Sequence, residues 1–248
     1  MLFNKSEKEY TLFADIISSP EGNYDRNQGH NIYRVIFMLY IIIFSIVSYL
    51  IGSLNTAIII SKKFYKQDIR NLGSLNAGAS NAVRSLGKKA GAIVFLIDFL
   101  KGFLLVEAVL ILVSKTDAPY EATLFAGFFA QVGHIFPIFF NFRGGKGVAV
   151  AAGAAMAVMP LTASVLLGCF VIILLITRTV SLASAICAAG YPLLAYFFSV
   201  EKKTVNFIFA AACAVLITLK HSSNFIRLIN GKEEKIEFKK NQRNHNSE

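Results

Sequence analysis

The sequence has few charged residues and few cysteines. Only 16% of its 248 residues are charged, while 55% are hydrophobic and the mean hydropathy is +0.55. A soluble domain usually has a larger charged share, so this composition indicates a protein solvated by lipid. The cysteines, Cys169, Cys187 and Cys213, fall inside apolar runs without metal-ligand spacing. We therefore expect neither a disulfide nor a metal site. No apolar run with a small-residue cleavage site follows the first charges, so we expect the N-terminal segment to remain.

Apolar runs that could cross a bilayer, which takes about 20 residues, recur between residues 33 and 219. They predict an all-α integral membrane protein. Met159 and Pro160 interrupt one run, and the alternative to a break there is a single kinked helix. With the break, we expect about seven transmembrane helices, at 35–60, 90–113, 121–141, 147–158, 161–176, 180–200 and 205–219.

The two ends of the chain differ from this apolar middle. We predict a polar N-terminal extension at 1–32, a polytopic membrane domain at 33–224 and a basic cytoplasmic tail at 225–248. If there are seven crossings, the loops and tail on one side hold 17 of the 25 Lys and Arg residues, and those on the other side hold seven. Cytoplasmic loops retain such residues, so the N-terminus should lie outside and the C-terminus in the cytoplasm. The net charge of +10 then reflects membrane insertion and anionic lipid, and no nucleic acid partner is implied.

The first polar constellation is GSLNAGASNAVR, from Gly73 to Arg84, on the predicted inner side. Small residues let backbone N–H groups approach an anion, and an arginine offers a fixed fork to phosphate oxygens. The segment lacks the Gly-Lys-Ser/Thr of a nucleotide P-loop, which disfavours ATP. The alternative is a polar loop between helices.

The second constellation is FRGGKGVA, from Phe142 to Ala149, preceded by Gly133-His134-Ile135-Phe136-Pro137. Its glycines and Lys146 open directly into a predicted helix. We expect unpaired N–H groups, the positive end of a helix dipole and an ammonium group to form an anion site there. The alternative is a tight turn whose lysine only marks the cytoplasmic side. We interpret His134 as a packing residue.

The third constellation combines Ser181-Leu182-Ala183-Ser184 with Lys220-His221-Ser222-Ser223-Asn224. Either part could simply cap a helix. Within the predicted spans, Asp98 and Lys101 are three residues apart on one helical face. Because ionisable groups in a membrane are usually paired or functional, we expect them to form a structural pair.

From about Gly52 to Lys235, the chain resembles the PlsY family of bacterial membrane acyltransferases. The resemblance is carried by the following segments in this order: GSLNAGASNAVR, DFLKG, GHIFP with FRGGKGVA, SLAS and HSSNFIRLINGKEEK. The resemblance implies a seven-helix enzyme of the bacterial cell membrane. Such an enzyme transfers a fatty acyl group from acyl phosphate to the 1-hydroxyl of sn-glycerol 3-phosphate. The products are lysophosphatidic acid and inorganic phosphate, in the first step of phospholipid biosynthesis.

The resemblance also implies the site. We expect the catalytic residues to be Ser74, Arg84, Lys146, His221 and Asn224. The expected substrate-binding residues are Gly73, Asn76, Gly78, Asn81, Gly144, Gly145, Gly147, Ser181 and Ser184. No metal, nucleotide or other cofactor is implied. The expected partners are the two substrates, the lipid bilayer and, through function, the enzyme that makes acyl phosphate.

Acyl transfer from a mixed anhydride has a good leaving group, so positioning and fixed donors can supply most of the acceleration. The base for the glycerol hydroxyl is either His221 or a phosphate of the substrate. A transporter of an organic phosphate is the alternative function. The one-sided placement of the polar residues and the absence of an inverted repeat argue against it. A purely structural scaffold would leave Gly144 to Gly147 unexplained.

Overall fold

A computed structural model describes residues 26–200 and 202–235, with side chains from Arg34 onwards. All regular structure in these ranges is helical, which confirms the predicted all-α class. The longer helices are α2 (Arg26–Gly52), α5 (Lys88–Lys115), α6 (Tyr120–Ile135), α8 (Pro160–Thr177), α9 (Val180–Phe198) and α10 (Lys203–Lys220). The shorter ones are α3 (Thr56–Tyr65), α4 (Ala79–Leu86), α7 (Val148–Val158) and α11 (Ser222–Ile229), with two single 3-10 turns at Ile69–Asn71 and Ile138–Phe140.

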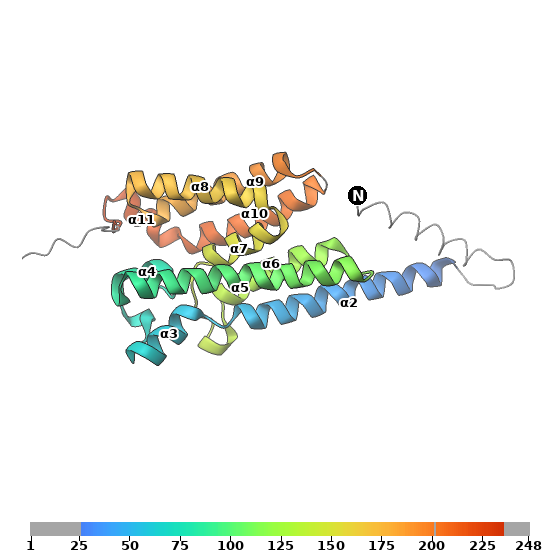
Figure 1. Ribbon diagram of the computed structural model, residues 1–248, viewed down its shortest axis with the longest axis horizontal. Helices are drawn as coiled ribbons and strands as arrows, with labels where there is room; N and C mark the ends of the chain where they lie inside the picture. Colours follow the sequence, from blue (N-terminus) through green and yellow to red (C-terminus); the bar gives the residue numbers. More distant parts are fainter. Residues whose placement is uncertain (1–25, 201, 236–248) are drawn as a thin grey trace, which may run out of the picture. The chain divides into compact units, whose positions relative to one another are not determined.

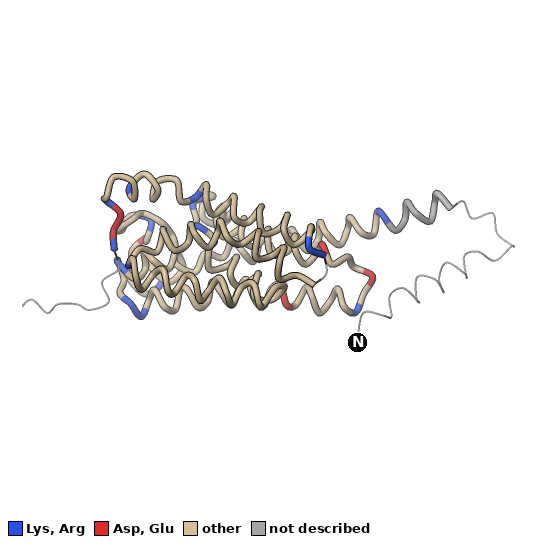
Figure 2. The backbone as a smooth tube through the Cα atoms, turned by 90° about the horizontal axis from the view of Figure 1, so that it is seen from above, with Lys and Arg blue, Asp and Glu red and all other residues tan. Residues whose placement is uncertain are grey.

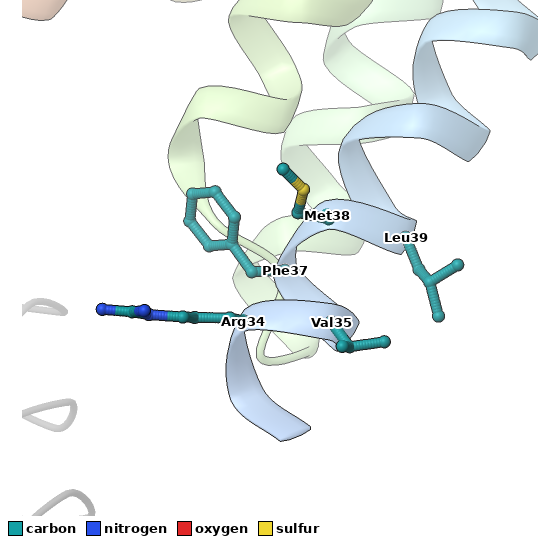
Figure 3. Close-up of a pocket in the computed structure, with 5 residues that line it drawn as sticks. All are labelled: Arg34, Val35, Phe37, Met38 and Leu39. Atoms are coloured by element: carbon teal, nitrogen blue, oxygen red, sulfur yellow. The ribbon is translucent and has the colours of Figure 1, made fainter. Parts of the chain in front are cut away.

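The chain divides into two compact units, residues 1–39 and residues 40–248. In the first unit, the described part of α2 exposes apolar side chains around the helix. Val35, Met38 and Leu39 are each at least half exposed, and Figure 3 shows Phe37 and Leu39 pointing to different sides. An apolar surface all round a helix is typical of contact with lipid. The predicted extension at 1–32 lies mostly outside the described residues.

The second unit is a bundle in which α5 packs along α4, α6 and α7, while α9 packs between α8 and α10 (Figure 1). Its largest buried apolar cluster joins α6 to α10, from Leu124 through Met159 and Tyr191 to Cys213. Close backbone approach at glycines tightens the bundle. A Cβ on Gly102 would lie 2.2 Å from the carbonyl oxygen of Val150, so α5 and α7 can meet only because this residue has no side chain.

Five helical segments in the described ranges are long and apolar enough to cross a membrane, at 34–65, 120–140, 160–177, 180–198 and 203–220. The long helix α5 carries Asp98, Lys101 and Glu107, and α7 has only 11 residues. The count of seven spans and the orientation therefore stay predictions. In Figure 2, Lys and Arg gather at the end of the bundle that carries α4 and α11.

The predicted break after residue 158 is confirmed. Met159 leaves the helical conformation, and Pro160 starts α8 at a position where its missing N–H is tolerated. The Ser164 hydroxyl lies 4.0 Å from the sulfur of Met156, eight residues earlier. A continuous helix would separate these residues by about 12 Å along its axis, so the chain turns sharply here.

The predicted helix at 35–60 lies within the membrane-length segment 34–65, but it is not continuous, because α2 ends at Gly52 and α3 starts at Thr56. Two local bonds favour this break. The Ser53 hydroxyl donates to the carbonyl of Tyr49 at 2.8 Å, and the Asn55 side chain caps α3 by accepting from the Ile58 amide. The segment between the first two predicted helices, residues 61–89, likewise contains a helix, α4. The break between α2 and α3 and the helix α4 both help to position the site residues.

Candidate active site

The loop before α4 is organised by one buried asparagine. The Asn81 Oδ1 accepts from the amide of Ser74 at 2.9 Å, and its Nδ2 donates to the carbonyls of Ile69, Leu72 and Asn76. Gly73 has φ +51°, and a Cβ on it would lie 2.4 Å from Asn81 Oδ1. This glycine therefore lets the loop close over Asn81.

The helix α4 begins at the rim of a cavity. Gly78 precedes it and provides no side-chain cap, so the first N–H groups of α4 lack an intrahelical acceptor. These groups and the positive end of the helix dipole favour an anion. Arg84 lies in the last turn of the same helix and also lines the cavity.

The loop before α7 differs from its predicted form. The amides of Gly144 and Gly145 donate to the carbonyls of Ile135 and His134 at 3.2 and 3.1 Å. The prediction that these amides are unpaired is wrong, because the loop folds back onto the end of α6. A Cβ on Gly145 would lie 2.2 Å from His134 Nε2, so these glycines allow close packing. Substrate contact by Gly144 or Gly145 stays a prediction.

The last glycine of this loop keeps its predicted position. Gly147 has φ +77° and precedes α7 without a side-chain cap. It lines the cavity with Val148 and Ala149, the first residues of α7. The first turn of α7 therefore offers a second set of N–H groups. Next to it, Lys146 Nζ donates to Asn224 Oδ1.

Residues of the third constellation line the cavity from α9, the end of α10 and α11. The Ser181 hydroxyl and the Asn224 Nδ2 both donate to Oε1 of Glu233, at 2.9 and 2.6 Å. The Ser184 hydroxyl is buried, lines the same cavity and has no hydrogen-bond partner in the described chain. Of these two serines, Ser184 is therefore the one whose hydroxyl remains available to a ligand.

The cavity has a volume of about 110 Å³ and gathers residues from all three constellations. Every predicted site residue lines it except Gly73, Gly144 and Gly145. The lining members of that set are Ser74, Asn76, Gly78, Asn81, Arg84, Lys146, Gly147, Ser181, Ser184, His221 and Asn224. Segments more than 140 residues apart in the sequence thus meet at one place. An apolar side is formed by Phe95 of α5, Phe170 of α8 and Val180 of α9.

Burial shifts the pKa values of two groups that line the cavity, Lys146 and His221. Burial lowers the pKa of Lys146 to about 8, partly opposed by the negative charge of Glu233. Burial, and then the charge of Lys146, lower the pKa of His221 to about 4. At neutral pH, His221 is therefore neutral and Lys146 is mostly charged.

The orientation of His221 follows from its hydrogen bond. Its Nδ1 lies 2.8 Å from the carbonyl oxygen of Ile217. A carbonyl can only accept, so Nδ1 carries the proton and the neutral ring has a free acceptor at Nε2.

Glu233 is the main site residue that the sequence reasoning missed. Burial alone would raise its pKa, but hydrogen bonds from Asn224, Ser181 and Arg227 outweigh burial and place the pKa below its usual value. Its carboxylate also forms an ion pair with Arg227 at 2.8 Å. The signal that could have found it is a pair of adjacent glutamates in an otherwise basic tail.

The predicted pair of Asp98 and Lys101 is confirmed, with Nζ 3.1 Å from Oδ1. The same Oδ1 accepts from the Thr56 hydroxyl at 2.7 Å and lies 3.6 Å from His134 Nδ1. Lys101 also donates to the carbonyls of Gly52 and Leu54. The pair therefore supports the break between α2 and α3, while Asp98 and His134 also line the cavity. Within the described side chains, no cluster of three His, Cys, Asp or Glu could hold a metal ion.

Known proteins are similar in sequence to most of this chain. A family model described as glycerol-3-phosphate acyltransferase matches residues 42–231. A glycerol-3-phosphate acyltransferase of Finegoldia magna is 39% identical over 198 residues, which cover 80% of this chain and 97% of the relative. One of Thermoanaerobacter pseudethanolicus is 40% identical over 198 residues, covering 80% and 96%.

A solved structure is similar in fold as well. The crystal structure of PlsY (YgiH), an integral membrane glycerol 3-phosphate acyltransferase, in its glycerol 3-phosphate form, aligns with a TM-score of 0.72 and 36% identity. The alignment covers 79% of this chain and 96% of that one. Together with the membrane-length helices of the bundle, these matches show a multi-pass membrane protein with acyltransferase activity. The chain belongs to the glycerol-3-phosphate acyltransferase family.

Proposed function

We propose that this acyltransferase moves a fatty acyl group from acyl phosphate to the 1-hydroxyl of sn-glycerol 3-phosphate. The hydroxyl oxygen bonds to the acyl carbon, the bond from that carbon to the phosphate oxygen breaks, and lysophosphatidic acid and inorganic phosphate form. The observation that carries this proposal is the convergence of Arg84, Lys146 and the N-terminal turns of α4 and α7 on one cavity.

Two phosphate-bearing substrates need this arrangement. Two cationic side chains offset the repulsion between the phosphates, and the two helix ends supply fixed N–H donors for their oxygens. Phe95 and Phe170 on the apolar side suit an acyl chain, which has to leave the cavity toward lipid. Positioning two reactants in this way can supply most of the rate enhancement when the leaving group is good.

The pKa of His221 bears on the identity of the base. With a pKa of about 4, this histidine is a weaker proton acceptor than a phosphate monoester, whose second pKa is about 6. We infer that a substrate phosphate takes the proton of the 1-hydroxyl, and that His221 Nε2 orients glycerol 3-phosphate by accepting a hydrogen bond from its other hydroxyl. Acyl phosphate would be supplied by a separate enzyme that makes it.

A direct assay tests the proposal. Purified protein in detergent receives palmitoyl phosphate and labelled glycerol 3-phosphate, without acyl-CoA or acyl carrier protein. We expect labelled lysophosphatidate from the wild type and from Lys115→Met, a control at an exposed lysine of α5, and at least tenfold less from Lys146→Met. Uptake of label into liposomes without acylated product would instead favour the transporter.

A further inference from the structure

After α11, the chain returns to the cavity through a short acidic segment. Gly231 turns with φ +65°, and the amide of Lys232 donates to the carbonyl of Arg227 at 2.7 Å. The next residue, Glu233, is held by three side-chain donors, as described above. This anchor places Glu234 beside α4, 150 residues earlier in the sequence.

Glu234 makes two contacts with the guanidinium group of Arg84. One terminal nitrogen of Arg84 lies 3.1 Å from the Glu234 carboxylate, and the other donates to the Glu234 carbonyl at 2.9 Å. Arg84 Nε is buried and has no partner in the described part of the chain. Both terminal nitrogens of a residue that lines the cavity are therefore bound to an internal group.

A phosphate that binds Arg84 through its fork competes with this group. The paired N–H donors of an arginine can hold a phosphate in a planar fork. Glu234 already takes one terminal nitrogen with its carboxylate and the other with its carbonyl, so Glu234 and the phosphate compete for the same donors. The competitor is displaceable, because the Glu234 side chain is 62% exposed and exposed ion pairs are weak. The cavity of about 110 Å³ is also smaller than the usual small-molecule site of about 300 Å³ or more.

We propose that Glu234 is an internal competitor for Arg84 that sets how tightly the site binds its anionic substrate. The phosphate of the substrate replaces the Glu234 carboxylate on the guanidinium, while the anchor at Glu233 keeps the segment attached. This inference rests on the proposed function, because it assumes that a phosphate binds Arg84.

The test measures binding of glycerol 3-phosphate to the purified protein in detergent by calorimetry, without an acyl donor. Glu234→Gln removes the competing charge, and we expect its Kd to be about two- to fivefold lower than that of the wild type. This difference in Kd between Glu234→Gln and the wild type should shrink when salt is raised from 0.05 to about 0.5 M, because salt screens the exposed pair of Arg84 and Glu234. In an Arg84→Gln background, Glu234→Gln should change the Kd by less than about 1.5-fold.

A matched control is Glu121→Gln. Glu121 is also a glutamate in a solvent-accessible ion pair, with Lys202 at 3.7 Å, and it does not line the cavity. Its Kd should equal that of the wild type. An equal gain in this control, or an unchanged or higher Kd for Glu234→Gln, would overturn the role of Glu234.

The outcome for the wild type separates this role from the proposed function. A wild-type protein that acylates glycerol 3-phosphate, together with an unchanged Kd in Glu234→Gln, overturns only the role of Glu234. A wild-type protein that neither binds nor acylates it overturns both.

Discussion

The charge of Lys146 should control how the site responds to pH. Its pKa of about 8 in the ligand-free protein predicts that roughly nine in ten molecules carry the charge at pH 7 and roughly one in ten at pH 9. A bound phosphate stabilises the ammonium and raises this pKa. Anion binding is therefore strongest below pH 8 and weakens as pH rises through 8.

The size of the effect follows from a single titration. If the charged form alone binds productively, kcat/KM for glycerol 3-phosphate falls about tenfold between pH 7 and pH 9. Each further pH unit lowers it about tenfold, which is about 1.4 kcal/mol. Because kcat/KM reports the free enzyme, the midpoint should lie near the ligand-free pKa. On the acidic side, activity should fall near pH 6 as the substrate phosphate loses its second charge.

The assay is initial-rate acylation from pH 5.5 to 10, with palmitoyl phosphate as donor and a blank without protein at each pH. Lys146→Arg stays charged throughout this range, so its alkaline decline near pH 8 should disappear even if its maximum is lower. Lys146→Met should give a low profile without that decline. A decline with the same midpoint in Lys146→Arg would refute the assignment to Lys146.

Three further predictions concern other parts of the bundle. Gly145→Ala places a Cβ 2.2 Å from Nε2 of His134, so kcat/KM should fall at least tenfold. As a control, the Cβ of Gly168→Ala would meet no atom within 4 Å, so this variant should keep wild-type kinetics and thermal stability. His221→Gln should lower kcat and leave the acidic limb near pH 6 in place, because that limb reports the substrate phosphate. Loss of all turnover in this variant would instead favour a histidine base. Asp98→Asn leaves the charge of Lys101 without its counterion, at a cost of about 3 kcal/mol or more, so it should lower the unfolding temperature in detergent. The double variant with Lys101→Met should recover only part of the loss, because it also removes the bonds of Lys101 to the carbonyls of Gly52 and Leu54. An unchanged unfolding temperature in Asp98→Asn would contradict the structural role of this pair.

Helix placement was largely predictable because lipid imposes a length and a composition on each span. The break at Met159 followed from the proline that starts α8. The break at Ser53 to Asn55 was missed because the apolar run continues through it. Contacts from Lys101 to the carbonyls of Gly52 and Leu54 add to the local bonds that favour this break, and the sequence does not reveal them.

The site was predictable as a set of polar segments but not in its hydrogen bonding. Glycines and a lysine before a helix indicated an anion site, and Gly147 fits that pattern. The sequence could not reveal that the amides of Gly144 and Gly145 are already paired, because their acceptors lie at the end of another helix. Glu233 and Glu234 fell within the predicted basic cytoplasmic tail at 225–248, since nothing local predicts that the chain folds back after α11.

The central claim is that one cavity joins two phosphate-bearing substrates for acyl transfer. The most direct measurement follows inorganic phosphate and lysophosphatidate in the same reaction of purified protein with palmitoyl phosphate and glycerol 3-phosphate. The account predicts equal amounts of the two products, and neither product above the blank when glycerol 3-phosphate is omitted. Phosphate release without glycerol 3-phosphate, or no lysophosphatidate when both substrates are present, would contradict it.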